Sequence, residues 1–272
     1  MSNQQVIGVF DSGFGGLTVL RALLQRIPQA RYAFLGDTAR LPYGSKSRRT
    51  IARYAAESAQ FLVREQGAEY LVIACNTASA LALDAIQDAV PVPVLGVIEP
   101  GAASARAASQ TGDVLVIATD ATVQSHAYAA ACRAQGLRAL EKACPLLVPL
   151  VEEGWTQHPV TAEVFRIYLD ELLRDATEEG MSPDTLVLGC THYPLLRPMI
   201  ALAVPAGMRV IDSAEATAET AATLFQPYDG ANNSQAAQIR CFATDSVEKF
   251  ERLGSRFLER PVGKVELIDL GG

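Results

Sequence analysis

Short apolar runs recur along the chain, and each stops abruptly at small or polar residues before a helical pattern begins. Near-continuous apolar runs are typical of parallel strands that are buried on both faces. Their alternation with helical patterns indicates right-handed β–α–β units. The sequence therefore predicts an α/β protein with mainly parallel sheets flanked by helices. The predicted strands cover residues 6–10, 32–35, 71–74, 114–118, 186–189 and 210–211.

Helices are predicted in three of the intervening segments, and the first of them has the clear signal. Over residues 51–62 the apolar positions recur with the period of a helix, and Gly67 follows as a stop signal. A second helix is predicted over about 161–179, and a third over 77–89. Such helices supply the crossovers that parallel strands need.

Small and polar residues follow the ends of the predicted strands. In open parallel sheets, ligands bind outside the carboxyl ends of the strands. These clusters are therefore candidates for one crevice, or for two crevices that face each other. They are Asp11-Ser12-Gly13, Gly36-Asp37, Cys75-Asn76-Thr77, Thr119, Cys190-Thr191-His192 and Asp212-Ser213.

A faint internal repeat relates two of these strand ends. Residues 69–77 align with residues 184–192, and residues 6–11 align with residues 114–119. The repeat predicts two pseudo-symmetric lobes in which Cys75 and Cys190 take equivalent positions. If the lobes face each other, the two thiols approach one ligand from opposite sides.

Composition narrows the classes of function. The net charge of −7 argues against nucleic acid or an anionic membrane as the main partner. The first residues lack the pattern of a secretory signal, and no apolar run reaches the roughly 18 residues of a membrane span, so we expect a cytoplasmic protein. Five cysteines without a C-x-x-C pair do not suggest a disulfide framework, and three scattered histidines do not suggest a metal site.

Cys75 and Cys190 each stand where a strand ends and a helix is predicted to begin. A helix start lowers the pKa of a nearby thiol and favours the thiolate. Two opposed thiols suit two-base proton transfer, in which one thiolate removes a proton from a carbon and the other thiol delivers one to the opposite face. That exchange inverts the carbon centre, as a racemase requires. The alternative is that both are small core residues, the role we expect for Cys132, Cys144 and Cys241.

Other residues near the strand ends suit supporting roles. Asp11 is a candidate for orienting a thiol or binding a substrate ammonium group, and its alternative role is to cap the following helix. His192 is a candidate for tuning Cys190 or holding a substrate carboxylate. Backbone N–H and hydroxyl groups for carboxylates are expected from Pro42-Tyr43-Gly44, Thr119 and Thr122.

Five motifs together resemble the ordered motif set of glutamate racemases, which belong to the aspartate/glutamate racemase superfamily. The resemblance extends over about residues 6–215, and the Thr-His pair after the second cysteine is the glutamate racemase form, whereas aspartate racemases usually carry Thr-Glu. The resemblance implies two α/β lobes with the active site between them. The first lobe would comprise residues 1–98 plus 210–272, and the second residues 99–209. The motifs are Val9-Phe-Asp-Ser-Gly-Phe-Gly-Gly-Leu-Thr18, Gly36-Asp-Thr, Leu41-Pro-Tyr-Gly44, Ala74-Cys-Asn-Thr-Ala78 and Leu188-Gly-Cys-Thr-His-Tyr-Pro-Leu195.

The same resemblance implies a cofactor-independent, metal-free isomerase that interconverts L- and D-glutamate for peptidoglycan synthesis, usually as a homodimer. Cys75 and Cys190 would be the two bases, with Asp11 assisting the first. His192 and Glu152 would assist the second. The residues implied in substrate binding are Asp11, Ser12, Tyr43, Gly44, Asn76, Thr77, Thr191 and His192, and Pro42, Thr119 and Thr122 complete the predicted set.

Several alternatives stay open on the sequence alone. The chain is alternatively an aspartate or hydantoin racemase, or a related decarboxylase, although a decarboxylase of this type needs only one cysteine. A third class is a two-lobed protein that binds an acidic amino acid without chemistry. Turnover of glutamate, aspartate and hydantoins separates the enzymes, and exchange of the α-proton with solvent separates an enzyme from a binding protein.

Overall fold

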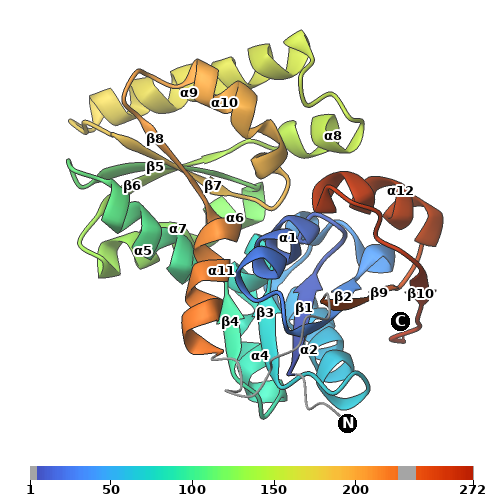
Figure 1. Ribbon diagram of the computed structural model, residues 1–272. Helices are drawn as coiled ribbons and strands as arrows, with labels where there is room; N and C mark the ends of the chain where they lie inside the picture. Colours follow the sequence, from blue (N-terminus) through green and yellow to red (C-terminus); the bar gives the residue numbers. More distant parts are fainter. Residues whose placement is uncertain (1–4, 226–236, 272) are drawn as a thin grey trace.

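The computed structural model describes residues 5–225 and 237–271, so that part of the predicted first lobe, residues 1–4, 226–236 and 272, lies outside the described residues. Parallel strands form a first sheet in the order β10-β9-β2-β1-β3-β4 (Figure 1). Their inner residues are buried on both faces, which explains the continuous apolar runs. The strands are β1 (Val6–Asp11), β2 (Arg31–Gly36), β3 (Tyr70–Ile73), β4 (Val94–Gly96), β9 (Gln238–Ala243) and β10 (Val265–Leu267).

A second parallel sheet has the order β6-β5-β7-β8. Its central strands, β5 and β7, are buried throughout. The bounds are β5 (Asp113–Ala118), β6 (Arg138–Ala143), β7 (Thr185–Gly189) and β8 (Arg209–Asp212). The predicted α/β class with two mainly parallel, helix-flanked sheets is thus confirmed.

Helices cover both faces of the first sheet. The longest of them, α2, begins at an N-cap, Ser47, whose hydroxyl accepts a bond from Thr50 N at 3.4 Å, and it buries the predicted apolar stripe. The predicted stop at Gly67 has a positive φ of 69°. α2 packs with α3 and α4, while α1 packs with α11 and α12 (Figure 1). The bounds are α1 (Leu17–Arg26), α2 (Arg48–Arg64), α3 (Asn76–Leu81), α4 (Leu83–Ala89), α11 (Ser213–Leu224) and α12 (Val247–Leu258).

The second sheet is also covered on both faces. Helices α5 and α7 lie on one side, and α9 and α10 lie on the other (Figure 1). None of the described helices is long and apolar enough to span a membrane. The bounds are α5 (Ile98–Ala108), α6 (Asp120–Ser125), α7 (Ala127–Ala134), α8 (Leu147–Glu152), α9 (Pro159–Glu178) and α10 (Arg197–Ala203).

Two predicted features differ from the structure. The continuous helix over 77–89 is wrong, because the chain leaves the helical conformation at Ala82, where φ is −138°, and divides the segment into α3 and α4. The boundary predicted between 209 and 210 falls inside β8, whose residues pair with β7, so residues 209–212 go with the second sheet. The division into two lobes otherwise stays a prediction.

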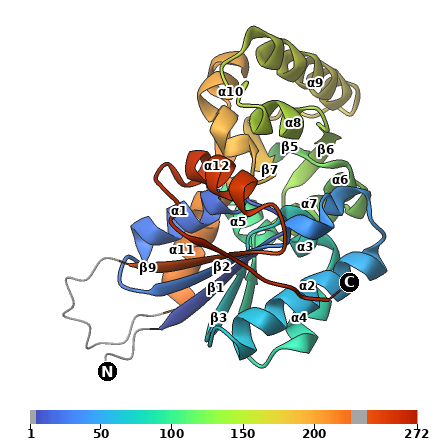
Figure 2. The same cartoon turned by 90° about the vertical axis from the view of Figure 1, so that its right-hand side faces the viewer.

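The C-terminal segment lies against the first sheet. Figure 2 shows β9 running beside β2, and the two strands pair in parallel from Arg31 with Gln238 to Gly36 with Ala243. The following helix, α12, packs on α1. The carboxyl ends of strands from both sheets meet at one cavity, where such sheets bind ligands.

Candidate active site

One cavity of about 500 Å³ collects most of the predicted site residues. They come from strand ends and the segments that follow them in both sheets, except for Glu152, which ends α8. The lining includes Ser12, Pro42, Tyr43, Gly44, Cys75, Asn76, Thr77, Thr119, Glu152, Cys190, Thr191 and His192. Leu41, Asp120, Pro145, Val148, Pro149 and Lys249 also line it and were not predicted.

Cys75 enters the cavity from the first sheet. It follows β3 as the N-cap of α3, and its Sγ accepts a bond from Ala78 N at 3.4 Å. The same sulfur donates to Ser12 Oγ at 3.4 Å. Burial first, and then the carboxylate of Asp11, raise the pKa of Cys75 to about 12. The lowered pKa expected at a helix start is therefore wrong for this thiol, because desolvation outweighs the bonds to Ala78 and Ser12.

Asp11 stands behind Cys75 and does not line the cavity. It ends β1, and its Oδ2 accepts a bond from Gly13 N at 2.9 Å. The alternative role as cap of the next helix is wrong, since the N-cap of α1 is Gly16. Burial raises the pKa of Asp11, and Oδ1 has no hydrogen-bond partner among the described residues.

Cys190 enters the cavity from the second sheet, directly after β7. Its predicted partners follow in order, His192 next to the thiol and Glu152 next to His192. His192 Nδ1 lies 3.9 Å from Cys190 Sγ, and His192 Nε2 lies 3.3 Å from Glu152 Oε1. Burial lowers the pKa of His192, but the bonds to Cys190 and Glu152 outweigh it and raise the pKa to about 10. The imidazole is therefore an imidazolium at neutral pH.

Lys249 also lines the cavity and places a positive charge beside Glu152. It belongs to α12, and its Nζ lies 3.3 Å from Glu152 Oε2. Phe257 of the same helix meets the His192 ring edge-on, with centroids 5.0 Å apart. Burial raises the pKa of Glu152, but His192 and then Lys249 outweigh it and lower the pKa. The carboxyl is therefore ionised, and it holds the imidazolium.

The threonines connect a strand end of the first sheet with a strand end of the second, and not all of them face the cavity. Thr77 Oγ1 lies 3.2 Å from Thr119 Oγ1 and 3.3 Å from Thr122 Oγ1. Thr122 is fully buried and lies behind the other two. Tyr43 likewise turns its hydroxyl away, donating to Asp37 Oδ2 at 2.6 Å. Tyr43 and Gly44 nevertheless both line the cavity.

Within residues 5–225 and 237–271, no group of three or more His, Cys, Asp and Glu side chains is placed to hold a metal ion. The chemistry the lining offers is acid–base chemistry. Two thiols come from opposite sheets, one beside a buried carboxyl and one beside an imidazolium. Hydroxyl, amide and backbone N–H groups between them suit carboxylate oxygens.

Comparison with known proteins identifies relatives that match over nearly the full chain and share its fold. The family model described as Asp/Glu/Hydantoin racemase matches residues 7–221. A glutamate racemase of Koribacter versatilis is 52% identical, and the alignment covers 100% of both chains. A crystal structure of a glutamate racemase isoform from Bacillus anthracis superposes with a TM-score of 0.88 at 36% identity, covering 98% of each chain. That of the Francisella tularensis glutamate racemase in complex with D-glutamate gives 0.85 at 34% identity, covering 99% of each.

Proposed function

Because the chain belongs to the Asp/Glu/Hydantoin racemase family, and because its full-length relatives are glutamate racemases, we propose that it interconverts L-glutamate and D-glutamate. The observation that carries this proposal is the placement of two thiols, Cys75 and Cys190, in the lining of one cavity, each from a different sheet. A carbon centre held between them is open to proton transfer on both faces. The enzyme is accordingly an isomerase.

The reaction needs two proton transfers at the α-carbon. One thiolate takes the α-proton and becomes a thiol, and the opposite thiol gives a proton to the other face and becomes a thiolate. The total number of protons on the two sulfurs is unchanged, and no cofactor takes part. Because the α-proton is a very weak acid, the site also has to stabilise the carbanion-like transition state with fixed dipoles and charges.

The two thiols have different neighbours. With the pKa of Cys75 raised to about 12, this sulfur holds its proton and acts as the proton donor. Cys190 lies 3.9 Å from an imidazolium that can donate a hydrogen bond to a thiolate, so it acts as the base. In the opposite direction the two roles exchange.

The substrate carboxylates are held by the residues between the thiols. Asn76, Thr77 and Thr119 supply amide and hydroxyl groups at one side of the cavity. Ser12, Thr191 and His192 supply further donors, and the Pro42-Tyr43-Gly44 turn supplies backbone N–H groups. Asp11 and Thr122 act from behind, through Cys75 and Thr77.

The physiological role that we propose is the supply of D-glutamate for peptidoglycan synthesis in the cytoplasm, by a homodimer without nucleic-acid or membrane partners. The family and the acidic net charge of −7 support this assignment. Sedimentation of the purified protein at several concentrations tests the dimer.

The function is tested by following the circular dichroism of D-glutamate and the exchange of its α-proton in deuterated solvent. Wild-type protein should racemise glutamate without added pyridoxal phosphate, and Cys75→Ala and Cys190→Ala should each abolish racemisation. Cys241→Ala is the matched control, because this buried thiol lies in β9, outside the cavity lining. Full racemisation by either cavity variant would exclude the two-base assignment. Faster turnover of aspartate or hydantoins, or calorimetric binding without exchange, would support the alternative functions.

A further inference from the structure

A buried tyrosine of the second lobe, Tyr128, forms a hydrogen bond to Asn76, the residue after Cys75. Tyr128 belongs to α7, which packs on the second sheet, and its hydroxyl donates to Asn76 Oδ1 at 2.7 Å. Tyr128 is fully buried, and it is not among the residues that line the cavity. Asn76 is the cavity-lining residue that the hydroxyl bonds, and Ser213 of α11 is its second side-chain partner.

The tyrosine ring has little freedom to move. A Cβ atom added at Gly189, the residue before Cys190, would stand 2.9 Å from ring atom Cε2. One added at Gly101 of α5 would stand 3.3 Å from Cε1. These two glycines form the slot that admits the ring, so the position of the hydroxyl is fixed by the backbone of the second lobe.

The bond also decides which end of the Asn76 amide is available. Tyr128 occupies Oδ1, whereas Nδ2 is buried and has no hydrogen-bond partner among the described residues. A buried donor without an acceptor is unfavourable, and a ligand oxygen removes that penalty. Since Asn76 lines the cavity, the amide is prepared to donate to an anionic oxygen there.

We propose that Tyr128 is a positioning residue, which holds the Asn76 amide so that Nδ2 is presented to a carboxylate of glutamate. The proposal rests on the function proposed above. The orientation of the Asn76 amide then depends on the second lobe, because the hydroxyl that fixes it belongs to α7. Lobe geometry and substrate affinity are thereby coupled through one hydrogen bond.

The test is Tyr128→Phe, which removes the hydroxyl and keeps the ring. Losing one fixed donor–acceptor arrangement should raise the KM for glutamate, and the Kd measured by calorimetry in the Cys190→Ala background, about tenfold. The kcat should change less than about twofold, because neither thiol loses a contact. An unchanged KM in a variant with a cooperative thermal transition overturns the proposal.

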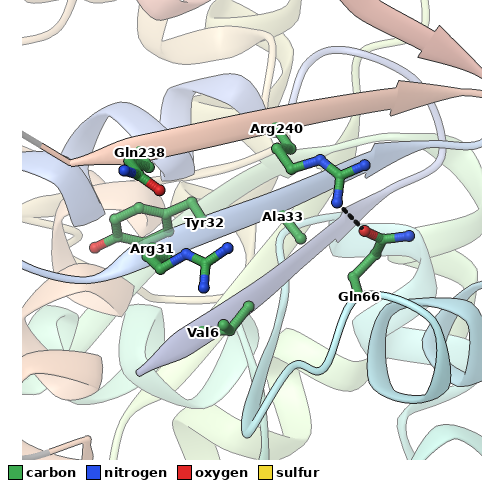
Figure 3. A pocket seen from close by; sticks show the side chains of 7 residues that line it. All are labelled: Val6, Arg31, Tyr32, Ala33, Gln66, Gln238 and Arg240. Atoms are coloured by element: carbon green, nitrogen blue, oxygen red, sulfur yellow. Dashed lines mark hydrogen bonds between the residues drawn. The ribbon is translucent and has the colours of Figure 1, made fainter. Parts of the chain in front are cut away.

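Tyr32→Phe is the matched control. Tyr32 is also buried and donates its hydroxyl to two backbone oxygens, Leu23 O at 3.1 Å and Ile27 O at 2.8 Å. Figure 3 shows it on β2 beside a small pocket that is separate from the thiol cavity. This variant should lower the melting temperature and leave the KM unchanged. A KM rise of equal size in both variants would mean that Tyr128 acts only through stability, and would overturn the proposal.

Two further variants complete the experiment. In an Asn76→Ala background, adding Tyr128→Phe should give no further rise in KM, and additive effects contradict the coupling. Asn76→Asp keeps an acceptor for Tyr128 but replaces Nδ2 with oxygen, so its KM should rise at least as much as in Tyr128→Phe. An unchanged KM in Asn76→Asp overturns the proposal even if Tyr128→Phe does not fold. Wild-type protein without turnover refutes the proposed function itself, and this inference with it.

Discussion

Burial disfavours the charged form of both Cys75 and His192, but their neighbours differ. Cys75 therefore stays neutral, whereas His192 carries a charge. At Cys75, desolvation and a nearby carboxylate act in the same direction and raise the pKa of the thiol. At His192, desolvation opposes the charge, but two bonding partners outweigh it and raise the pKa to about 10. The first thiol is therefore kept protonated and the second is placed beside a cation, although both lie in the same cavity.

Glu152→Gln should move the alkaline limit of activity to lower pH. The substitution removes a carboxylate that raises the pKa of His192, so the imidazolium should lose its proton roughly one pH unit earlier or more. The pH profile of kcat/KM for racemisation measures the shift. The neighbouring Glu153→Gln is the matched control, because Glu153 is exposed and does not line the cavity. Superimposable profiles for the two variants would show that Glu152 does not hold the charge on His192.

The contact between His192 and Glu152 also makes the stability of the protein depend on pH. Because the His192 pKa is raised from 6.5 to about 10, its stabilising effect is complete below about pH 6.5 and is lost as the pH rises through about 10. The melting temperature of Glu152→Gln should therefore fall further below that of wild type at pH 6 than at pH 10.

Among single residues, the sequence predicts the site residues that lie in strand-end motifs. It misses those that come to the site from helices elsewhere in the chain. Cys75, Cys190 and their neighbours follow apolar strands, so their place at a sheet edge can be inferred. Lys249 lies on a helix of the C-terminal segment, and its position beside Glu152 depends on how that segment folds back. Tyr128 carries no local signal, because only the tertiary fold brings its hydroxyl to Asn76.

Among elements, the strands that the pattern reveals are those buried on both faces. β1, β5 and β7 are nearly all apolar. The pattern does not reveal β6, Arg-Ala-Leu-Glu-Lys-Ala, because this edge strand is only partly buried, nor the three-residue β4 and β10. Sheet position therefore affects which strands can be recognised, since an edge strand has less need for continuous apolar residues. The edge strand β8 is recognised only because it keeps the apolar pair Val210-Ile211.

Gly67→Ala should destabilise the protein by about 1 kcal/mol. Gly67 follows α2 with φ of 69°, and no atom lies within 4 Å of the position of an added Cβ, so the effect is one of backbone conformation alone. Urea unfolding measures it. Gly67→Asn is the control, since asparagine tolerates the left-handed region better, and it should recover part of the loss. Equal stability of wild type and Gly67→Ala would contradict this account.

At the scale of the molecule, the two sheets do not have separate cores. One continuous apolar cluster contains residues of α1 and β1 from the first sheet and residues of β5, β7 and α9 from the second. Helix α11 joins them, because it packs on α1 and on α5. A second cluster, on the α2 side of the first sheet, stays within that sheet. The two sheets and their helices are therefore expected to unfold together.

Ala218→Leu should destabilise the whole molecule and alter substrate binding. Ala218 is fully buried in α11, where small residues allow α1 and α5 to approach, and a larger side chain should cost about 1–3 kcal/mol. A displaced α11 should also change the KM, because it sets the relation of the two sheets. Thr223→Leu, an exposed position of the same helix, should do neither. A destabilised variant whose two lobes unfold in separate transitions would contradict the shared core.

The pairing of β2 with β9 also sets an order of events during synthesis. All strands of the second sheet lie within residues 113–212, so that sheet can be complete while the chain is still being made. The first sheet cannot, because Arg31 of β2 pairs with Gln238 of β9. Until the last part of the chain leaves the ribosome, the hydrogen-bonding edge of β2 is open, and open edges invite pairing between chains. A nascent chain stopped after α11 would therefore be prone to aggregation even though its second sheet is fully formed.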